Sequence, residues 1–156
     1  MNKYFTIEYI EHDHWNCLNL QDQELVIKAF EASKMAYAPY SNFSVGASLR
    51  MEDQSIICGN NQENIAYPSG LCAERVALFH VGANFPSKKI EKICIVAKGD
   101  LIPKDSILSP CGGCRQVMAE SEKRQNRSIE VILVSQNNKV LVFSSVADLI
   151  PLAFNS

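Results

Sequence analysis

Cysteines dominate the residues of this 156-residue chain that could do chemistry. Cys111 and Cys114 stand in SPCGGCRQVM with two residues between them, while Cys72 stands in LCAERVALF, two residues before Glu74. Pro110 predicts the first turn of a helix, in which two cysteines three apart lie on one face. The positive end of that helix favours thiolate. This pair alone fits a redox couple, a disulfide or two metal ligands.

The third cysteine favours the metal. Cys72 also opens a predicted helix and could bring a third thiolate to the same place. Three thiolates hold a tetrahedral Zn²⁺ with one position open, whereas structural zinc sites use four protein ligands. An open position indicates catalysis, because zinc lowers the pKa of a bound water and a nearby carboxylate can move its proton. We therefore predict one zinc ion per subunit on Cys72, Cys111 and Cys114, with Glu74 as the catalytic acid and base.

Charge balance at this site calls for positive groups. Zinc with three thiolates carries a net negative charge, which disfavours ionisation of a bound water. Two helix N-termini supply partial positive charge, and Arg75 can donate to a cysteine sulfur. Arg115, beside Cys114, is either a second such donor or a surface arginine.

The motifs resemble those of a known family. CAE at 72–74 and PCGGC at 110–114 resemble the zinc nucleoside and nucleobase deaminases. AYAPYSNFSVGA (36–47), NQEN (61–64), AYPSGLCAER (66–75) and SPCGGCRQVM (109–118) resemble the small, three-cysteine, homotetrameric cytidine deaminases. The likeness covers about residues 22–154. It implies a zinc enzyme that deaminates a small-molecule nucleoside, with sites shared between the subunits of a homotetramer.

The resemblance also implies substrate-binding roles. Asn61 and Glu63 correspond to the pair that hydrogen-bonds the ribose, and the backbone around Ala73 lies where the polar edge of the base is held. Three aromatic residues are implied at the site: one packs on the pyrimidine, one lies in a pocket shared between subunits, and one is inserted by a neighbouring subunit. These are, in order, Phe43, Tyr67 and Phe154. Without the resemblance, Glu63 reads equally well as a solvated loop carboxylate, and the aromatic residues as core.

The expected reaction is hydrolytic deamination of cytidine and 2′-deoxycytidine to uridine and 2′-deoxyuridine, with release of ammonia, in pyrimidine salvage. One alternative is a related zinc deaminase that acts on blasticidin S or another modified nucleoside. An alternative of a different class is a non-enzymatic, zinc-stabilised interaction module, which would need a fourth protein ligand and no Glu74.

Alternating helices and strands must position these residues. Helical spacing predicts helices over 22–37, with Asp22 as N-cap and a stop at Ala38-Pro39, and over 70–83, 110–121 and 146–151. Strands are expected over 45–50, 55–60, 89–97, 129–135 and 139–144. This order predicts an α/β fold with three α-β-α layers around a mixed, mostly five-stranded sheet. Residues 1–20 form an extension that either adds a strand or drapes over the domain.

Composition narrows the class of protein. The chain has 47% hydrophobic and 21% charged residues, which suits a single globular domain over 1–156. A net charge of −2 without a basic run argues against nucleic acid or a membrane as partner. Acidic residues near the start argue against a signal peptide, so we expect a cytoplasmic protein with reduced thiols. Cys17, Cys58 and Cys94 are given no role.

Overall fold

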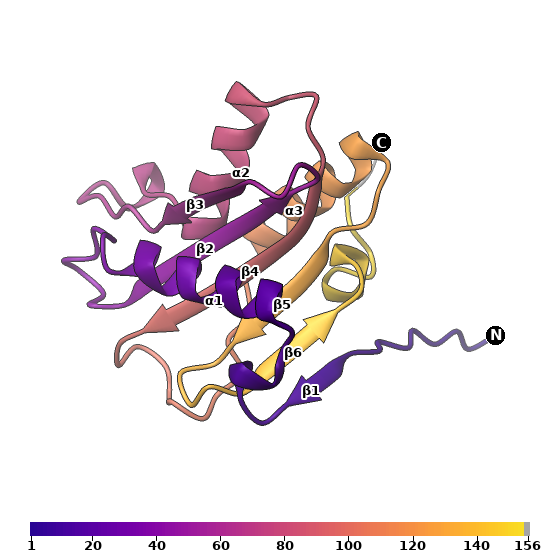
Figure 1. Ribbon diagram of the computed structural model, residues 1–156, viewed down its shortest axis with the longest axis horizontal. Helices are drawn as coiled ribbons and strands as arrows, with labels where there is room; N and C mark the ends of the chain where they lie inside the picture. Colours follow the sequence, from indigo (N-terminus) through magenta and orange to yellow (C-terminus); the bar gives the residue numbers. More distant parts are fainter. Residues whose placement is uncertain (155–156) are drawn as a thin grey trace.

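A mixed sheet runs through the molecule in the order β1-β6-β5-β4-β2-β3. Figure 1 shows the computed structural model, which describes residues 1–154. The strands are β1 (Ile10–His12), β2 (Ser44–Met51), β3 (Ile56–Asn60), β4 (Ile90–Lys98), β5 (Glu130–Val134) and β6 (Val140–Phe143). β4 and β5 run parallel, and the other neighbouring strands run antiparallel.

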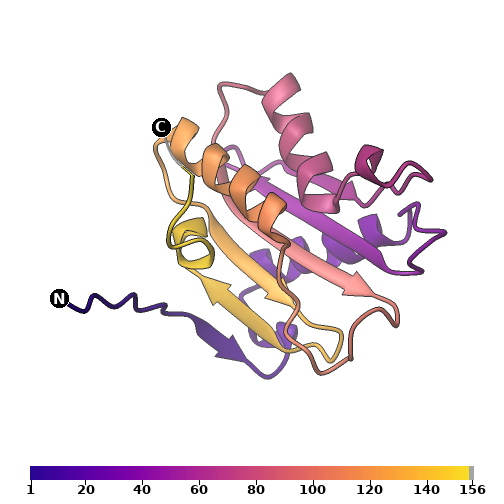
Figure 2. The same ribbon diagram turned by 180° about the vertical axis from the view of Figure 1, so that it is seen from behind.

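Helices cover both faces of this sheet (Figures 1 and 2). α1 (Leu20–Ser33) packs on one face and shares a buried cluster with β4, β5 and β6. α2 (Ala73–Asn84) and α3 (Gly112–Gln125) pack on the opposite face, over the larger cluster. The predicted α/β fold with three layers is therefore confirmed. Within residues 1–154 no helix combines the length and apolarity that crossing a membrane requires.

The sheet has six strands where five were expected. The extra strand is β1, which pairs antiparallel with β6, Ile10 lying opposite Val142 and His12 opposite Val140. Of the two expectations for residues 1–20, the added strand is the one observed. It was hard to predict because its pairing partner lies about 130 residues later in the chain.

Several helix boundaries differ from the prediction. The N-cap of α1 is Asn19, whose side chain accepts a hydrogen bond from the backbone N–H of Asp22, so Asp22 as N-cap was wrong. α1 ends at Ser33, before the expected stop, because the chain turns back so that Tyr37 bridges to Gln62. α3 runs on to Gln125, and the last predicted helix is a short 3₁₀ turn, η3 (Val146–Leu149). Two further 3₁₀ turns are η1 (Trp15–Cys17) and η2 (Tyr67–Ser69).

An ion cluster ties α1 to the sheet. Asp22, freed from capping, pairs with Arg50 of β2 and Lys92 of β4, each at 2.9 Å. Burial raises the pKa of Asp22, but hydrogen bonds from Lys92 and Arg50 outweigh it and leave the pKa below its ordinary value. Arg50 and Asp22 are both buried, so Arg50 depends on Asp22 for compensation of its charge.

Candidate metal and catalytic site

Three sulfur atoms meet at the N-termini of two helices. Cys72 is the N-cap of α2 and Cys111 the N-cap of α3, while Cys114 lies in the first turn of α3. All three Sγ atoms lie within 4.8 Å of one another, and those of Cys111 and Cys114 are 3.3 Å apart. Within residues 1–154, these three cysteines form a group whose sulfur atoms lie close enough together to hold one metal ion.

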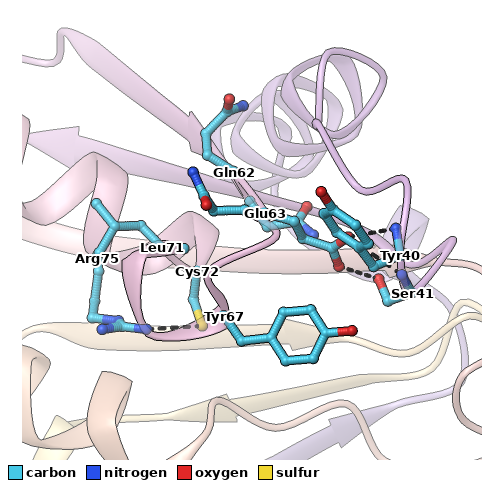
Figure 3. Close-up of a pocket in the computed structure, with 11 residues that line it drawn as sticks. Tyr40, Ser41, Gln62, Glu63, Tyr67, Leu71, Cys72 and Arg75 are labelled. Carbon is cyan, nitrogen blue, oxygen red and sulfur yellow. Dashed lines mark hydrogen bonds between the residues drawn. The ribbon is translucent and has the colours of Figure 1, made fainter.

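The cluster already favours negative charge on sulfur. The thiol of Cys114 donates to the sulfur of Cys72, and this bond, with help from Arg75, lowers the pKa of Cys72 to about 5. The Cys72 thiolate in turn raises the pKa of Cys114. Arg75 donates from a terminal nitrogen to the Sγ of Cys72 at 3.4 Å (Figure 3). The guanidinium of Arg75 and the N-termini of α2 and α3 therefore stabilise negative charge on the sulfur atoms.

Glu74 lies in the first turn of α2, beside the sulfur cluster. Its side chain is buried, and this burial raises the pKa of Glu74 to about 7, with a further upward contribution from Cys72. A carboxyl group with a pKa near neutrality can both accept and release a proton, which is what general acid and base catalysis requires.

The sheet holds this end of α2 at very close range. A Cβ atom on Gly59 of β3 would lie 2.6 Å from both the carbonyl oxygen of Ala73 and the backbone nitrogen of Ala77. Only glycine allows β3 and α2 to approach this closely. The positions of Cys72 and Glu74 therefore depend on this contact.

A cleft of about 450 Å³ opens onto Cys72 and Arg75. Its size lies within the range of small-molecule sites. Tyr67 stands at its wall with its ring edge-on to Tyr40, the ring centroids 5.9 Å apart (Figure 3). The lining residues are Tyr40, Ser41, Asn61, Gln62, Glu63, Asn64, Tyr67, Gly70, Leu71, Cys72 and Arg75. Most of these residues carry polar groups, but the surface that the cleft exposes is mostly apolar, and Cys72 is the member of the cysteine cluster that lines it.

Comparisons with known proteins agree with this chemistry. The family model described as "Cytidine and deoxycytidylate deaminase zinc-binding region" matches residues 19–141. The chain belongs to this family. A cytidine deaminase of Sporosarcina psychrophila is 37% identical over 133 residues, covering 85% of this chain and 90% of the relative. One from Halalkalibacterium halodurans is 43% identical over 100 residues, covering 64% of this chain and 71% of the relative.

Solved structures of the family have the same fold. The crystal structure of cytidine deaminase from Burkholderia pseudomallei is 37% identical, with a TM-score of 0.71, and covers 84% of this chain and 97% of that chain. The cytidine deaminase of Mycobacterium tuberculosis is 28% identical, with a TM-score of 0.65 and coverage of 85% and 96%. The predicted family, and with it a zinc-binding deaminase class of enzyme, is confirmed.

The sulfur cluster suits the zinc that the family model implies. Tetrahedral zinc with Zn–S bonds of about 2.3 Å spaces its sulfurs about 3.8 Å apart. The observed spread, from 3.3 Å to less than 4.8 Å, brackets that value. Cys72, Cys111 and Cys114 would hold the ion, and three sulfurs leave a fourth position for water or substrate.

Asn61 and Glu63, which the resemblance to cytidine deaminases predicts to bind the ribose, both line the cleft. The Glu63 carboxylate accepts hydrogen bonds from the backbone N–H groups of Tyr40, at 2.9 Å, and Ser41, at 3.3 Å, and from the Ser41 hydroxyl. These bonds, the Ser41 hydroxyl first, lower the pKa of Glu63. Asn61 accepts from the Val45 N–H and donates to the Phe43 carbonyl, both at 2.8 Å. Asn61 retains one donor and one acceptor position, and Glu63 retains one acceptor position.

Other predicted residues lie outside the wall of the cleft. Phe43 is 8% exposed and packs in the core, and Ala73 is fully buried at the start of α2. Phe154 is 85% exposed, with its backbone held by two hydrogen bonds to Gln116 of α3. Within one chain, the cleft therefore gathers Asn61, Glu63 and Tyr67 but neither of the two phenylalanines.

Arg115 is not a donor to sulfur. Its guanidinium donates to the Pro110 carbonyl, the Leu149 carbonyl and the Ser109 hydroxyl, at 2.9, 2.8 and 2.6 Å. It therefore braces the loop before Cys111 against the C-terminal segment. Its spacing from Cys114 could not reveal this, because its partner Leu149 lies 34 residues away.

Sequence reasoning missed Ser41 as a residue of the candidate site. A serine after Pro39-Tyr40 is typical of a turn. Nothing local connects it to a carboxylate 22 residues later. The signal available was its place inside the motif AYAPYSNFSVGA.

Proposed function

We propose that this deaminase hydrolyses cytidine and 2′-deoxycytidine to uridine and 2′-deoxyuridine with release of ammonia, using one zinc ion per subunit. The observation that carries the proposal is the buried Glu74, with its raised pKa, beside three converging cysteine sulfurs, of which that of Cys72 belongs to the wall of the cleft. A cofactor-free redox pair would use neither the third cysteine nor the acid.

Zinc bound at Cys72, Cys111 and Cys114 would act as a Lewis acid and bring the pKa of a coordinated water near neutrality. Glu74 takes a proton from the attacking water and delivers it to N3 of the cytosine ring. It then passes the second proton to the amino group that leaves from C4. Water adds, ammonia leaves, and the carboxylate ends as it began, so protons balance. Arg75 and the two helix N-termini offset the negative charge of the sulfurs throughout.

The sugar is recognised by Asn61 and Glu63. Because Ser41 and the backbone of Tyr40 already hold the Glu63 carboxylate, its free acceptor position is oriented before substrate arrives. A carboxylate that accepts from a ribose 3′-hydroxyl would be left unsatisfied by a free base, so the site prefers nucleosides. Tyr67 closes the wall of the cleft beside the sugar.

The complete site includes a second subunit. Phe43 packs behind the pyrimidine, the backbone at Ala73 holds its polar edge, and Phe154 of one subunit enters the site of its neighbour in a homotetramer. The exposure of Phe154 and the anchoring of its backbone by Gln116 support this role. The place of action is the cytoplasm, in pyrimidine salvage.

The test is turnover of cytidine, 2′-deoxycytidine, cytosine, adenosine and blasticidin S by the wild type and by Glu74→Gln. We expect turnover of the first two alone, and a fall of about 10³-fold or more in Glu74→Gln, because general acid–base catalysis contributes about 10²–10⁴-fold. Bound zinc, measured by mass spectrometry of the native protein, should stay at one per chain in the variant.

A matched control makes the same chemical change at a distance. Glu120→Gln, on the exposed side of α3, should keep wild-type turnover. Full activity in Glu74→Gln would remove its catalytic role. Turnover of blasticidin S alone would favour the modified-nucleoside alternative, and zinc binding without turnover of any substrate would favour the non-enzymatic module.

A further inference from the structure

The first nine residues form an arm that leaves the body of the protein. Residues 1–9 precede β1 without helix or strand and project from the edge of the sheet in Figures 1 and 2. They lie outside the matched family region, which begins at residue 19. The arm nevertheless carries large apolar side chains: Tyr4 is 85% exposed, Phe5 65%, Ile7 47% and Tyr9 52%. Such a run of exposed apolar residues is typical of an interaction surface.

The arm continues the line of an open sheet edge. β1 is the last strand of the sheet, so one of its sides pairs with β6 and the other presents unpaired backbone groups. The pairing of Glu11 with Leu141 places the odd-numbered side chains on the α2/α3 face, and the Tyr9 ring contacts Phe143 on that face, 5.5 Å between centroids. An unprotected edge that continues into an apolar strand-like segment is a template for another strand.

The arm is complementary to itself when read antiparallel. A two-fold axis normal to the sheet keeps each side chain on its own face, so paired residues must have the same parity. With the axis at Ile7, a positive side chain faces a negative one across the pair of strands, and apolar side chains face other apolar side chains. The facing residues are Lys3 with Glu11, Tyr4 with Ile10, Phe5 with Tyr9, and Ile7 with its own copy.

Neighbouring registers are worse. An axis at Glu8 would place this carboxylate opposite its own copy and Phe5 opposite Glu11. An axis at Thr6 would place Tyr4 opposite Glu8 and leave Lys3 without an acid. Opposite charges and aromatic pairs across strands stabilise a sheet, whereas like charges destabilise it. The axis at Ile7 is therefore the favoured arrangement.

We propose that residues 3–11 of two copies of this chain pair as antiparallel strands around a two-fold axis at Ile7, joining the two sheets edge to edge. Each arm then covers the open side of the partner's β1. Glu11 keeps its own ion pair with Lys139 at 3.3 Å, since both side chains are about half exposed and a carboxylate accepts several hydrogen bonds. The interface is separate from the zinc site, so it does not depend on the proposed function.

Cysteine cross-linking tests the pairing directly. In full-length protein with exposed Cys17 and Cys58 replaced by serine, we introduce Thr6→Cys, Ile7→Cys or Glu8→Cys singly and oxidise mildly. Residues directly opposite in an antiparallel pair have Cα atoms about 4.5–5.5 Å apart, within the reach of a disulfide, whereas diagonal neighbours are about 7–8 Å apart. Ile7→Cys should form a covalent dimer about tenfold faster than the other two.

Each other result overturns the proposal. The first such result is a yield of covalent dimer no higher than that of the serine background. The second is an equal cross-linking rate at the three positions, and the third is a fastest cross-linking rate at residue 6 or 8. A second variant tests the charge pair: Lys3→Glu should slow the cross-linking of Ile7→Cys about tenfold, because two acids then face each other. The matched Lys104→Glu, on an exposed loop, should leave the rate unchanged. Equal rates in both charge variants would refute the pairing.

Discussion

Replacing Gly59 by alanine should displace the end of α2 that carries Cys72 and Glu74. The added Cβ would lie 2.6 Å from the Ala73 oxygen and the Ala77 nitrogen, whereas ordinary contacts begin at 3.4 Å. Both atoms belong to helix backbone, so α2 must move by about 0.8 Å at the turn that follows Cys72 and contains Glu74. Misplacement of catalytic groups by about 1 Å can cost about 10²-fold in rate.

The assay separates displacement from unfolding. Overpacking should cost about 1–3 kcal/mol and lower Tm by about 2–12 °C, which leaves Gly59→Ala folded at room temperature. We expect kcat/KM for cytidine to fall about 10²-fold in protein whose near-UV circular dichroism shows it to be folded.

The matched control is Gly82→Ala on the same helix. Its Cβ would meet nothing nearer than the Arg124 side chain at 3.7 Å, so activity should be unchanged. Stability should rise by about 0.5–1 kcal/mol, because alanine is the better helix former. Wild-type kcat/KM in Gly59→Ala, or an equal loss in Gly82→Ala, would refute the argument that close approach to β3 positions the site.

Two further predictions concern side chains that sequence reasoning misjudged. Ser41→Ala removes a hydroxyl group that donates a hydrogen bond to Glu63. Because one such bond contributes about 1 kcal/mol, KM for cytidine should rise about fivefold with little change in kcat. Steady-state kinetics measure both constants, and a lowered kcat at unchanged KM would contradict this prediction. For Asp22, the folded pKa lies below the ordinary value, so its contribution to the unfolding free energy is complete at neutral pH and is lost as pH falls below about 4 toward the folded pKa. Asp22→Asn should cost about 3 kcal/mol at neutral pH by leaving buried Arg50 unpaired, and should flatten the acid limb of denaturant midpoint against pH; an unchanged acid limb would contradict the assignment.

Local patterns were enough to predict most of the secondary structure. The apolar run of 89–97 and the segments around it gave strands close to the observed β4, β5 and β6, because strand and helix periodicities are written in neighbouring residues. Boundaries were less predictable. Asn19 caps α1 in place of Asp22 because Asp22 is drawn into ion pairs with Arg50 and Lys92, residues on strands that local reasoning could not bring together with it.

The sequence by itself determined the chemistry: three thiols and an acid whose types and spacing are typical of a zinc deaminase, and the α/β order that carries them. Only the tertiary structure decided which side chains meet. It brought Cys72 to Cys111 and Cys114, Ser41 to Glu63, Arg115 to the Leu149 carbonyl, and β1 to the edge of the sheet. The reason is physical: residue type and local periodicity are short-range properties, whereas these contacts arise from packing two layers of helices on one sheet, which joins segments that are distant in the chain.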